Sequence, residues 1–176
     1  MPSVPILETP RLRLRSHEKT DLPTYLAMRA HPNVFRFTSG RPFTQEEAWQ
    51  RIIISVGQWL LSGFGVWAIE DKASGDFIGE LGFNDARRDG LASTHGIPEA
   101  GWLLAADRHG KGYATEAVRA IHEWGDAHFA DGRTVCAVRV GNQASIRLAE
   151  RIGYRLKEET VYRELPVLLF ERNRPL

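Results

Sequence analysis

The chain has 176 residues, of which 43% are hydrophobic and 26% are charged, a balance typical of a soluble globular domain. Its 23 lysines and arginines nearly cancel its 22 aspartates and glutamates, so the net charge of +1 argues against partners that demand a strongly basic surface, such as nucleic acid or an anionic membrane. The single cysteine, Cys136, excludes an intrachain disulfide and fits a reducing compartment. No linker, repeat or long apolar run interrupts the sequence, so we expect residues 1–176 to form one cytoplasmic domain.

The N-terminal part predicts a strand followed by two helices. The stretch "RLRLR" at 11–15 alternates with period two, as a half-exposed strand does. Apolar residues recur at helical spacing over 21–30. A second helix is expected over 44–60, because Thr44 and Glu47 have the spacing of a capping box just before an amphipathic run.

The middle of the chain predicts three strands in succession. The stretches 65–71 and 76–83 flank a turn signal rich in small and polar residues. The mostly apolar stretch 98–105 follows and leads directly into the glycine-rich segment "DRHGKGYATEAV".

After the glycines, the pattern predicts a helix, a strand, a second helix and two more strands. The buried-looking strand covers 134–140, the short helix covers 142–154 with Gly153 as its cap, and extended stretches follow at 155–162 and 167–172. The resulting order, β-α-α-β-β-β-α-β-α-β-β, indicates an α+β or mixed three-layer domain. The apolar face of the first of these helices is expected to carry Ala114, Ala117, Val118, Ile121, Trp124 and His128, the last as a packed core residue.

The glycine-rich turn does not fit two common phosphate-binding motifs. A P-loop requires glycine at position 105, where this chain has Ala105, and Lys111 is followed by Gly112 instead of serine or threonine. A dinucleotide fingerprint fits Gly110 and Gly112 but has Thr115 at its third position.

A third arrangement fits the turn better. Backbone N–H groups at the start of a helix can hold a pyrophosphate, and glycine lets the backbone approach the anion closely. Thr115 would cap the helix or bond a phosphate oxygen. The alternative is an ordinary turn in which the glycines serve only the backbone geometry.

Two segments together resemble a known family. "HGKGYATEAV" (109–118) and, about thirty residues later, "NQASIRLAERIGY" (142–154) resemble the GNAT superfamily of N-acetyltransferases. The resemblance is closest to the RimJ/RimL-like branch, whose best-known members acetylate the N-termini of ribosomal proteins. It extends over nearly the whole chain, including "LETPRLRLR", "HPNVFRF", "FIGELGF" and "PEAGWLL". The superfamily signature Gln/Arg-x-x-Gly-x-Gly/Ala maps onto His109, Gly112 and Ala114, with His109 departing from it.

The resemblance implies a mostly antiparallel central sheet with helices on both faces, and a site for acetyl-CoA. The pyrophosphate would rest on the turn at 108–115, with charge from Arg108 and Lys111. The pantetheine arm would follow the strand at 102–104, and Asn142 would bond the arm from the other side or serve only as a helix N-cap. The cofactor-binding residues expected from this resemblance are Trp102, Leu103, Leu104, Arg108, His109, Gly110, Lys111, Gly112, Tyr113, Ala114, Thr115 and Asn142.

Direct acetyl transfer to a primary amine, in a ternary complex, requires a neutral amine, a polarised carbonyl and a proton for the departing thiolate. Glu99 matches an acidic position of this branch and is expected to be the base, with Glu80 as second candidate. Apolar strand neighbours should raise the pKa of either carboxyl group. The alternative for either glutamate is that it has no catalytic role and is a charged residue at a strand end, facing solvent.

Ser145 is the candidate that bonds or protonates the thiolate. Many GNAT enzymes have a tyrosine where this chain has Ala149, and Ser145 lies one turn earlier on the same helix face, as is common in this branch. The alternative is a hydroxyl that bonds its own backbone near the helix start.

The remaining observations leave several points open. The six histidines form no metal-binding spacing, so we expect no metal ion. Phe35, Phe37 and Trp59 line an acceptor cleft or are simply core. The acceptor can be a peptide N-terminus or a small-molecule amine, and the chain a monomer or a homodimer. The alternative function is a non-catalytic acyl-CoA-binding or regulatory domain on the same fold.

Overall fold

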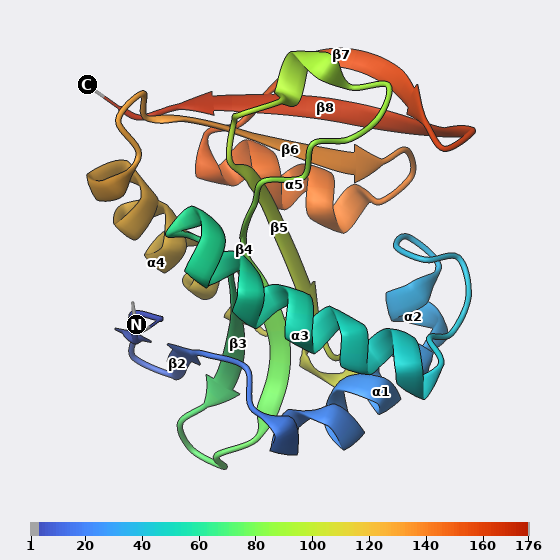
Figure 1. The fold of residues 1–176 in the computed structure, drawn as a ribbon, viewed down its shortest axis with the longest axis vertical. Coiled ribbons are helices and arrows are strands. Elements are labelled where there is room, and N and C mark those ends of the chain that lie inside the picture. The colour runs from blue at the N-terminus through green and yellow to red at the C-terminus, as the bar shows by residue number, and fades with distance from the viewer. Residues whose placement is uncertain (1–3, 176) are drawn as a thin grey trace.

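The computed structural model describes residues 4–175, which form one eight-stranded sheet (Figure 1). The strands are β1 (Leu7–Glu8), β2 (Leu12–Arg15), β3 (Val66–Asp71), β4 (Phe77–Asn84), β5 (Glu99–Leu104), β6 (Arg133–Arg139), β7 (Arg155–Tyr162) and β8 (Leu165–Asn173). Their order is β1-β2-β3-β4-β5-β6-β8-β7, and each neighbouring pair is antiparallel except β5 with β6. The predicted mixed α/β fold with a mostly antiparallel sheet is confirmed.

Helices connect the strands and cover the sheet. Figure 1 shows α3 crossing β3, β4 and β5, while β6, β7 and β8 lie together at the other end of the molecule. The helices are α1 (Leu22–Ala30), α2 (Pro32–Phe35), α3 (Gln45–Ser62), α4 (Tyr113–His128) and α5 (Gln143–Ile152), with short 3-10 helices at Lys19–Asp21, Ala92–Thr94 and Ala106–Arg108.

Successive side chains of a strand point to opposite faces of the sheet, and each face here has its own core. Ala68 of β3 packs with Tyr25 of α1 and Ile52 of α3. Its neighbour Trp67 packs on the other side against Trp124 of α4, in a core that also contains Val118 of α4 and residues of α5. The sheet is therefore the middle of three layers, with helices on both faces as expected.

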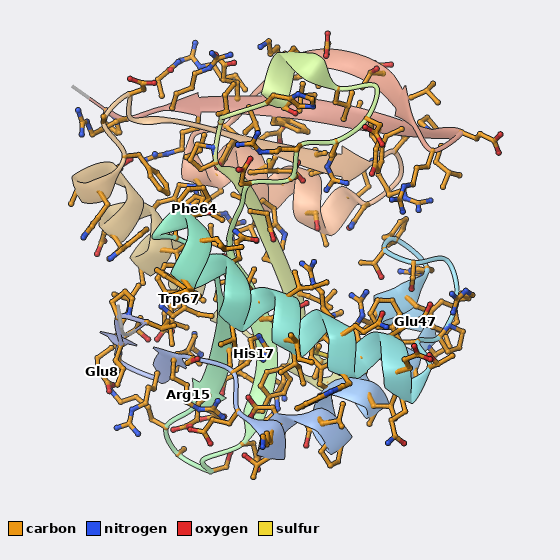
Figure 2. All side chains as sticks on the ribbon, in the orientation of Figure 1. Glu8, Arg15, His17, Glu47, Phe64 and Trp67 are labelled. Atoms are coloured by element: carbon orange, nitrogen blue, oxygen red, sulfur yellow. The ribbon has the colours of Figure 1, made fainter. Side chains whose placement is uncertain are left out.

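The predicted signals at the ends of α3 and α5 are present in the structure. Thr44 Oγ1 accepts from the N–H of Glu47 at 3.2 Å, and a carboxylate oxygen of Glu47 accepts from the N–H of Thr44 at 2.9 Å, which completes the capping box. In Figure 2, Glu47 lies at the start of α3 and Phe64 just beyond its end. Gly153 ends α5 in the left-handed region, with φ of 99°.

Three features differ from the sequence-based expectation. Strand β1 is too short to show an alternating pattern, and the short helix α2 was not expected; Pro32 occupies its first position and His31 caps it. The prediction that His128 is a core residue is wrong. His128 is the last residue of α4; its exposed ring stacks on Trp124 with 4.2 Å between the ring centres, whereas His122, six residues earlier, is the buried histidine of this helix.

Candidate active site

The two parallel strands at the centre of the sheet separate soon after they meet. Strands β5 and β6 are in register only at Glu99 and Val135, next to a bond from Val135 N–H to the Pro98 carbonyl at 3.1 Å. A cavity of about 550 Å³ lies where they diverge. It brings together six predicted site residues: Glu80, Glu99, Trp102, Leu103, Asn142 and Ser145.

The cavity reaches both faces of the sheet and exposes part of the β5 backbone. Glu99 and Trp102 are three positions apart on one strand and so point to opposite faces, yet both line the cavity. Ala105 N–H donates to Ile78 of β4, and peptide groups alternate sides in an antiparallel pair, so the N–H and C=O of Trp102 point away from β4. No strand in the described part of the chain pairs with them there, so an extended ligand could bond to them as an added strand.

Ser145 is positioned by the indole of Trp102. Trp102 Nε1 donates to Ser145 Oγ at 3.2 Å. An indole N–H only donates, so the serine oxygen is the acceptor and keeps its own O–H proton for another partner. The alternative, in which this hydroxyl bonds the helix backbone, is not observed among the described residues.

Asn142 caps α5. Its Oδ1 accepts from the N–H of Ser145 at 3.3 Å, which is the N-cap arrangement considered as the alternative for this residue. The side chain also lines the cavity, and its Nδ2 has no hydrogen-bond acceptor within residues 4–175. Capping therefore uses one end of the amide and leaves the donor end free.

Glu99 is held by a partly buried ion pair. Arg88 donates through Nε and Nη2 to the two carboxylate oxygens of Glu99, at 2.7 and 2.5 Å. The guanidinium of Arg88 in turn lies 4.7 Å from the ring centre of Tyr162. The predicted apolar surroundings of Glu99 are incomplete, because an arginine from the loop before β5 fills them and occupies both oxygens.

Glu80 is the second carboxylate of the cavity, and its environment differs from the prediction. Tyr25 donates its hydroxyl to Oε1 at 2.9 Å, and His17 Nε2 lies 3.5 Å from Oε2. Burial alone would raise the pKa of Glu80, but the interaction with His17 and the positive charges of Arg51 and Arg29 lower it to about 2. The expected raised pKa is therefore wrong for Glu80, which stays ionised at neutral pH.

The glycine-rich turn presents free backbone donors. No described residue accepts a hydrogen bond from the N–H groups of residues 110–115, which run through the turn into the first residues of α4. Gly110 and Gly112 adopt positive φ, 75° and 82°, a conformation that favours glycine. The turn therefore offers a run of free donors at the positive end of a helix dipole, as expected for a phosphate site.

The side chains of the turn are engaged differently from what the sequence indicates. Arg108 donates to Asp71 at 2.9 Å and to Asp76 at 3.3 Å, so its charge is already paired. The His109 ring donates through Nε2 to the Leu104 carbonyl at 3.0 Å and fixes the turn to the end of β5. Lys111, also in the turn, is exposed and makes no ion pair with a described residue.

Thr115 does not cap α4. The N-cap residue is Gly112, so Thr115 is the third residue of the helix and its side chain cannot act as the predicted cap. Tyr113, the first residue of α4, donates its hydroxyl to Asp71 at 3.2 Å.

The sequence reasoning missed the arginines that line the cavity, among them Arg29 of α1 and Arg51 of α3. A signal for Arg29 existed, because it stands at a core-facing position of the apolar stripe in 21–30. Of the aromatics considered for the acceptor side, Phe37 lines the cavity and Trp59 lies in the core, while Phe35 is outside the cavity wall.

Within residues 4–175 we find no cluster of side chains with the composition of a metal site. No helix in that range combines the length and the apolar character that crossing a bilayer demands.

Comparison with known proteins decides the family. A model of the acetyltransferase (GNAT) domain matches residues 11–155, which include both carboxylates, the glycine-rich turn and Ser145. The chain belongs to the GNAT acetyltransferase family. GNAT acetyltransferases use acetyl-CoA as acetyl donor and an amine as acceptor, so the cavity and the turn together are the place where such a site is expected.

Three known proteins are similar to this GNAT chain. The uncharacterized protein YkkB of Bacillus subtilis (strain 168) is 31% identical over 170 residues, with 94% of each chain covered. A solved structure from Bordetella pertussis, assigned to the GnaT family of acetyltransferases, is 30% identical with a TM-score of 0.85, covering 96% of this chain and 99% of that one.

The third comparison is with RimL, the ribosomal L7/L12 α-N-protein acetyltransferase, solved in complex with coenzyme A. Its TM-score is 0.77 over 96% of this chain and 98% of that one, at 17% identity. At that identity the similarity establishes the shared GNAT fold, in line with the resemblance to the RimJ/RimL-like branch.

Proposed function

We propose that residues 1–176 are a single N-acetyltransferase domain that transfers the acetyl group of acetyl-CoA directly to a primary amine in a ternary complex. The observation that carries the proposal is the row of free N–H groups at 110–115, which lies beyond the end of the strand whose free edge lines the cavity. The acceptor is a peptide N-terminus or a small-molecule amine.

The turn fits a diphosphate. Its donors have no protein partner in the described range, and neither glycine carries a Cβ that would keep phosphate oxygens away. Charge would come from Lys111, because Arg108 is paired with Asp71 and Asp76. The diphosphate is therefore held mainly by backbone groups.

Strand β5 would place the reacting carbonyl. A pantetheine arm bound along the free edge would bond to the N–H and C=O of Trp102 and lead the thioester into the cavity. Acetyl-CoA supplies the activated carbonyl, and a backbone N–H on this edge can polarise it. Asn142 contributes the free Nδ2 on the opposite wall.

The two carboxylates lie on the face of the sheet from which we expect the amine to enter. Glu80 remains ionised, and its Oε2 accepts no hydrogen bond from a described residue, whereas both oxygens of Glu99 are occupied by Arg88. A carboxylate with a pKa of about 2 is a weak base, so Glu80 would stabilise the positive charge that develops on the attacking nitrogen. The proton would then leave to water, and Glu99 would order that side of the cavity.

Ser145 would serve the leaving group. Its oxygen accepts from Trp102, so its proton is free to be donated to the sulfur as the carbon–sulfur bond breaks, and the serine oxygen would regain a proton from water. A hydroxyl is a weak acid, so we expect a contribution of roughly ten- to a hundredfold in rate, at or below the low end of general acid catalysis.

The test combines binding and turnover. Calorimetry with coenzyme A should detect binding, and a panel of dipeptides, polyamines and amino acids should include amines that release thiol from acetyl-CoA. Ser145→Ala and Glu80→Gln should lower kcat while the affinity for coenzyme A stays within about twofold. No heat on addition of coenzyme A would refute the proposal. Tight binding without turnover for any amine would favour the non-catalytic acyl-CoA-binding domain.

A further inference from the structure

One arginine in the cavity wall is buried without a partner. Arg29, in the last turn of α1, is 8% exposed, and its Nε is enclosed with no hydrogen-bond partner. Its guanidinium lies 3.8 Å from the ring centre of Phe43, and no carboxylate of the described chain forms an ion pair with it. A buried guanidinium without an anion is costly, so the arrangement calls for a bound ligand.

A second arginine faces the same space. Arg51 of α3 is partly exposed, lines the cavity and forms neither an ion pair nor a side-chain hydrogen bond with any residue of the described range. Glu80 is a carboxylate whose pKa both Arg29 and Arg51 lower, but it lies beyond ion-pair distance of both. Its oxygens are instead directed to Tyr25 and His17.

The charge of the cavity wall also favours an anionic ligand. Five arginines and two glutamates line it, and only the pair between Arg88 and Glu99 is a direct ion pair. The wall near α1 and α3 is therefore positive around the single carboxylate of Glu80. The planar guanidinium offers two parallel N–H groups, which match the two oxygens of a carboxylate.

We propose that Arg29 and Arg51 bind a carboxylate of the acceptor, and that the preferred acceptor is a small amino acid. This inference rests on the proposed function. The ammonium or amine of such a molecule would face Glu80 while its carboxylate meets the two arginines, so one zwitterion satisfies both signs of charge. A cavity of about 550 Å³, shared with the reacting end of acetyl-CoA, suits a ligand of this size.

The test compares free α-amino acids with the matching α-carboxamides as acceptors, measured by thiol release from acetyl-CoA. In the unmodified protein the acids should exceed the amides at least tenfold in kcat/KM. Arg29→Gln and Arg51→Gln should bring that ratio close to one. Arg155→Gln, which removes an exposed arginine outside the cavity, should keep the full preference. Equal rates for acids and amides in the unmodified protein would overturn the inference.

A second measurement separates this inference from the proposed transfer reaction. Calorimetry on the protein saturated with coenzyme A would use N-acetyl amino acids and their amides as ligands. Binding of the acids at least tenfold tighter than the amides, lost in Arg51→Gln, would support the carboxylate site even if no amine released thiol. Turnover of amides or of 2-aminoethyl phosphate, with no preference for carboxylates in either assay, would overturn the carboxylate site and leave the transferase intact. Arg51 is partly exposed, so its variant remains informative if Arg29→Gln fails to fold.

Discussion

The substitution Gly112→Ala tests the phosphate-binding turn most directly. Gly112 has φ of 82° and precedes the first residue of α4, between free N–H groups on either side. An alanine in this left-handed conformation costs about 1–2 kcal/mol of stability. The added Cβ would meet only Arg11 Nη2, at 3.3 Å, which is the end of a flexible side chain. The fold should therefore survive.

The effect on binding should exceed the effect on stability. A charge-assisted hydrogen bond contributes about 1.5–3 kcal/mol, so displacement of one phosphate contact should weaken coenzyme A binding by roughly ten- to a hundredfold. Calorimetry with coenzyme A measures this change. Pantetheine, which lacks the diphosphate, should bind the variant and the unmodified protein equally.

Gly90→Ala is the matched control. Gly90 also has φ of 82°, and a Cβ there would meet nothing within 4 Å, so the backbone strain is comparable while the site is remote from the turn. Gly90→Ala should lose similar stability and keep its affinity for coenzyme A. Unchanged affinity in Gly112→Ala, or the same loss in Gly90→Ala, would refute the assignment of the diphosphate to this turn.

Two further predictions concern acid stability and cavity space. Burial lowers the pKa of His122 from 6.5 to about 4. The neutral ring forms one hydrogen bond with the Val118 carbonyl and another with the Tyr154 hydroxyl. Because the unfolded chain then binds the proton more readily, the free energy of unfolding in urea should fall by about 2 kcal/mol from pH 8 to pH 5. This part of the loss should be absent in His122→Gln; an identical pH dependence in that variant would contradict the reasoning. Gly101→Val should reduce kcat/KM at least tenfold with a melting temperature within a few degrees of the unmodified protein, since a Cβ at Gly101 points into the cavity and meets only Asn84 Nδ2 at 3.8 Å. Unimpaired turnover in that variant would place the reaction elsewhere.

Most of the fold can be predicted from the sequence because the patterns that indicate strands, caps and turns are local. Alternating strands, the capping box at Thr44 and the glycine that ends α5 depend on neighbours a few residues away, and the structure contains each of them. The donor row at 110–115 is of the same kind, since two glycines before a helix determine its geometry.

The charge pattern of the site could not be predicted in this way. Glu80 owes its low pKa to His17, Arg29 and Arg51, which come from three other segments of the chain, and Glu99 is neutralised by an arginine in an irregular loop. Sequence spacing describes the apolar neighbours of a strand residue but not the charged groups that a distant helix brings against it. The raised pKa expected for Glu80 fails for that reason.

The single point of register between β5 and β6 has a mechanical consequence. The sheet consists of two halves, β1 to β5 and β6 to β8, that are paired at one position only. Beyond that position the facing edges of β5 and β6 are free to bind a ligand. In the proposed complex the arm of acetyl-CoA would lie between β5 and β6 and bond to the free edge of β5, so the two halves of the sheet should stiffen together. Amide exchange along the inner edges of both strands should slow on binding, so that the enzyme is most rigid at the moment the acetyl group is ready to leave.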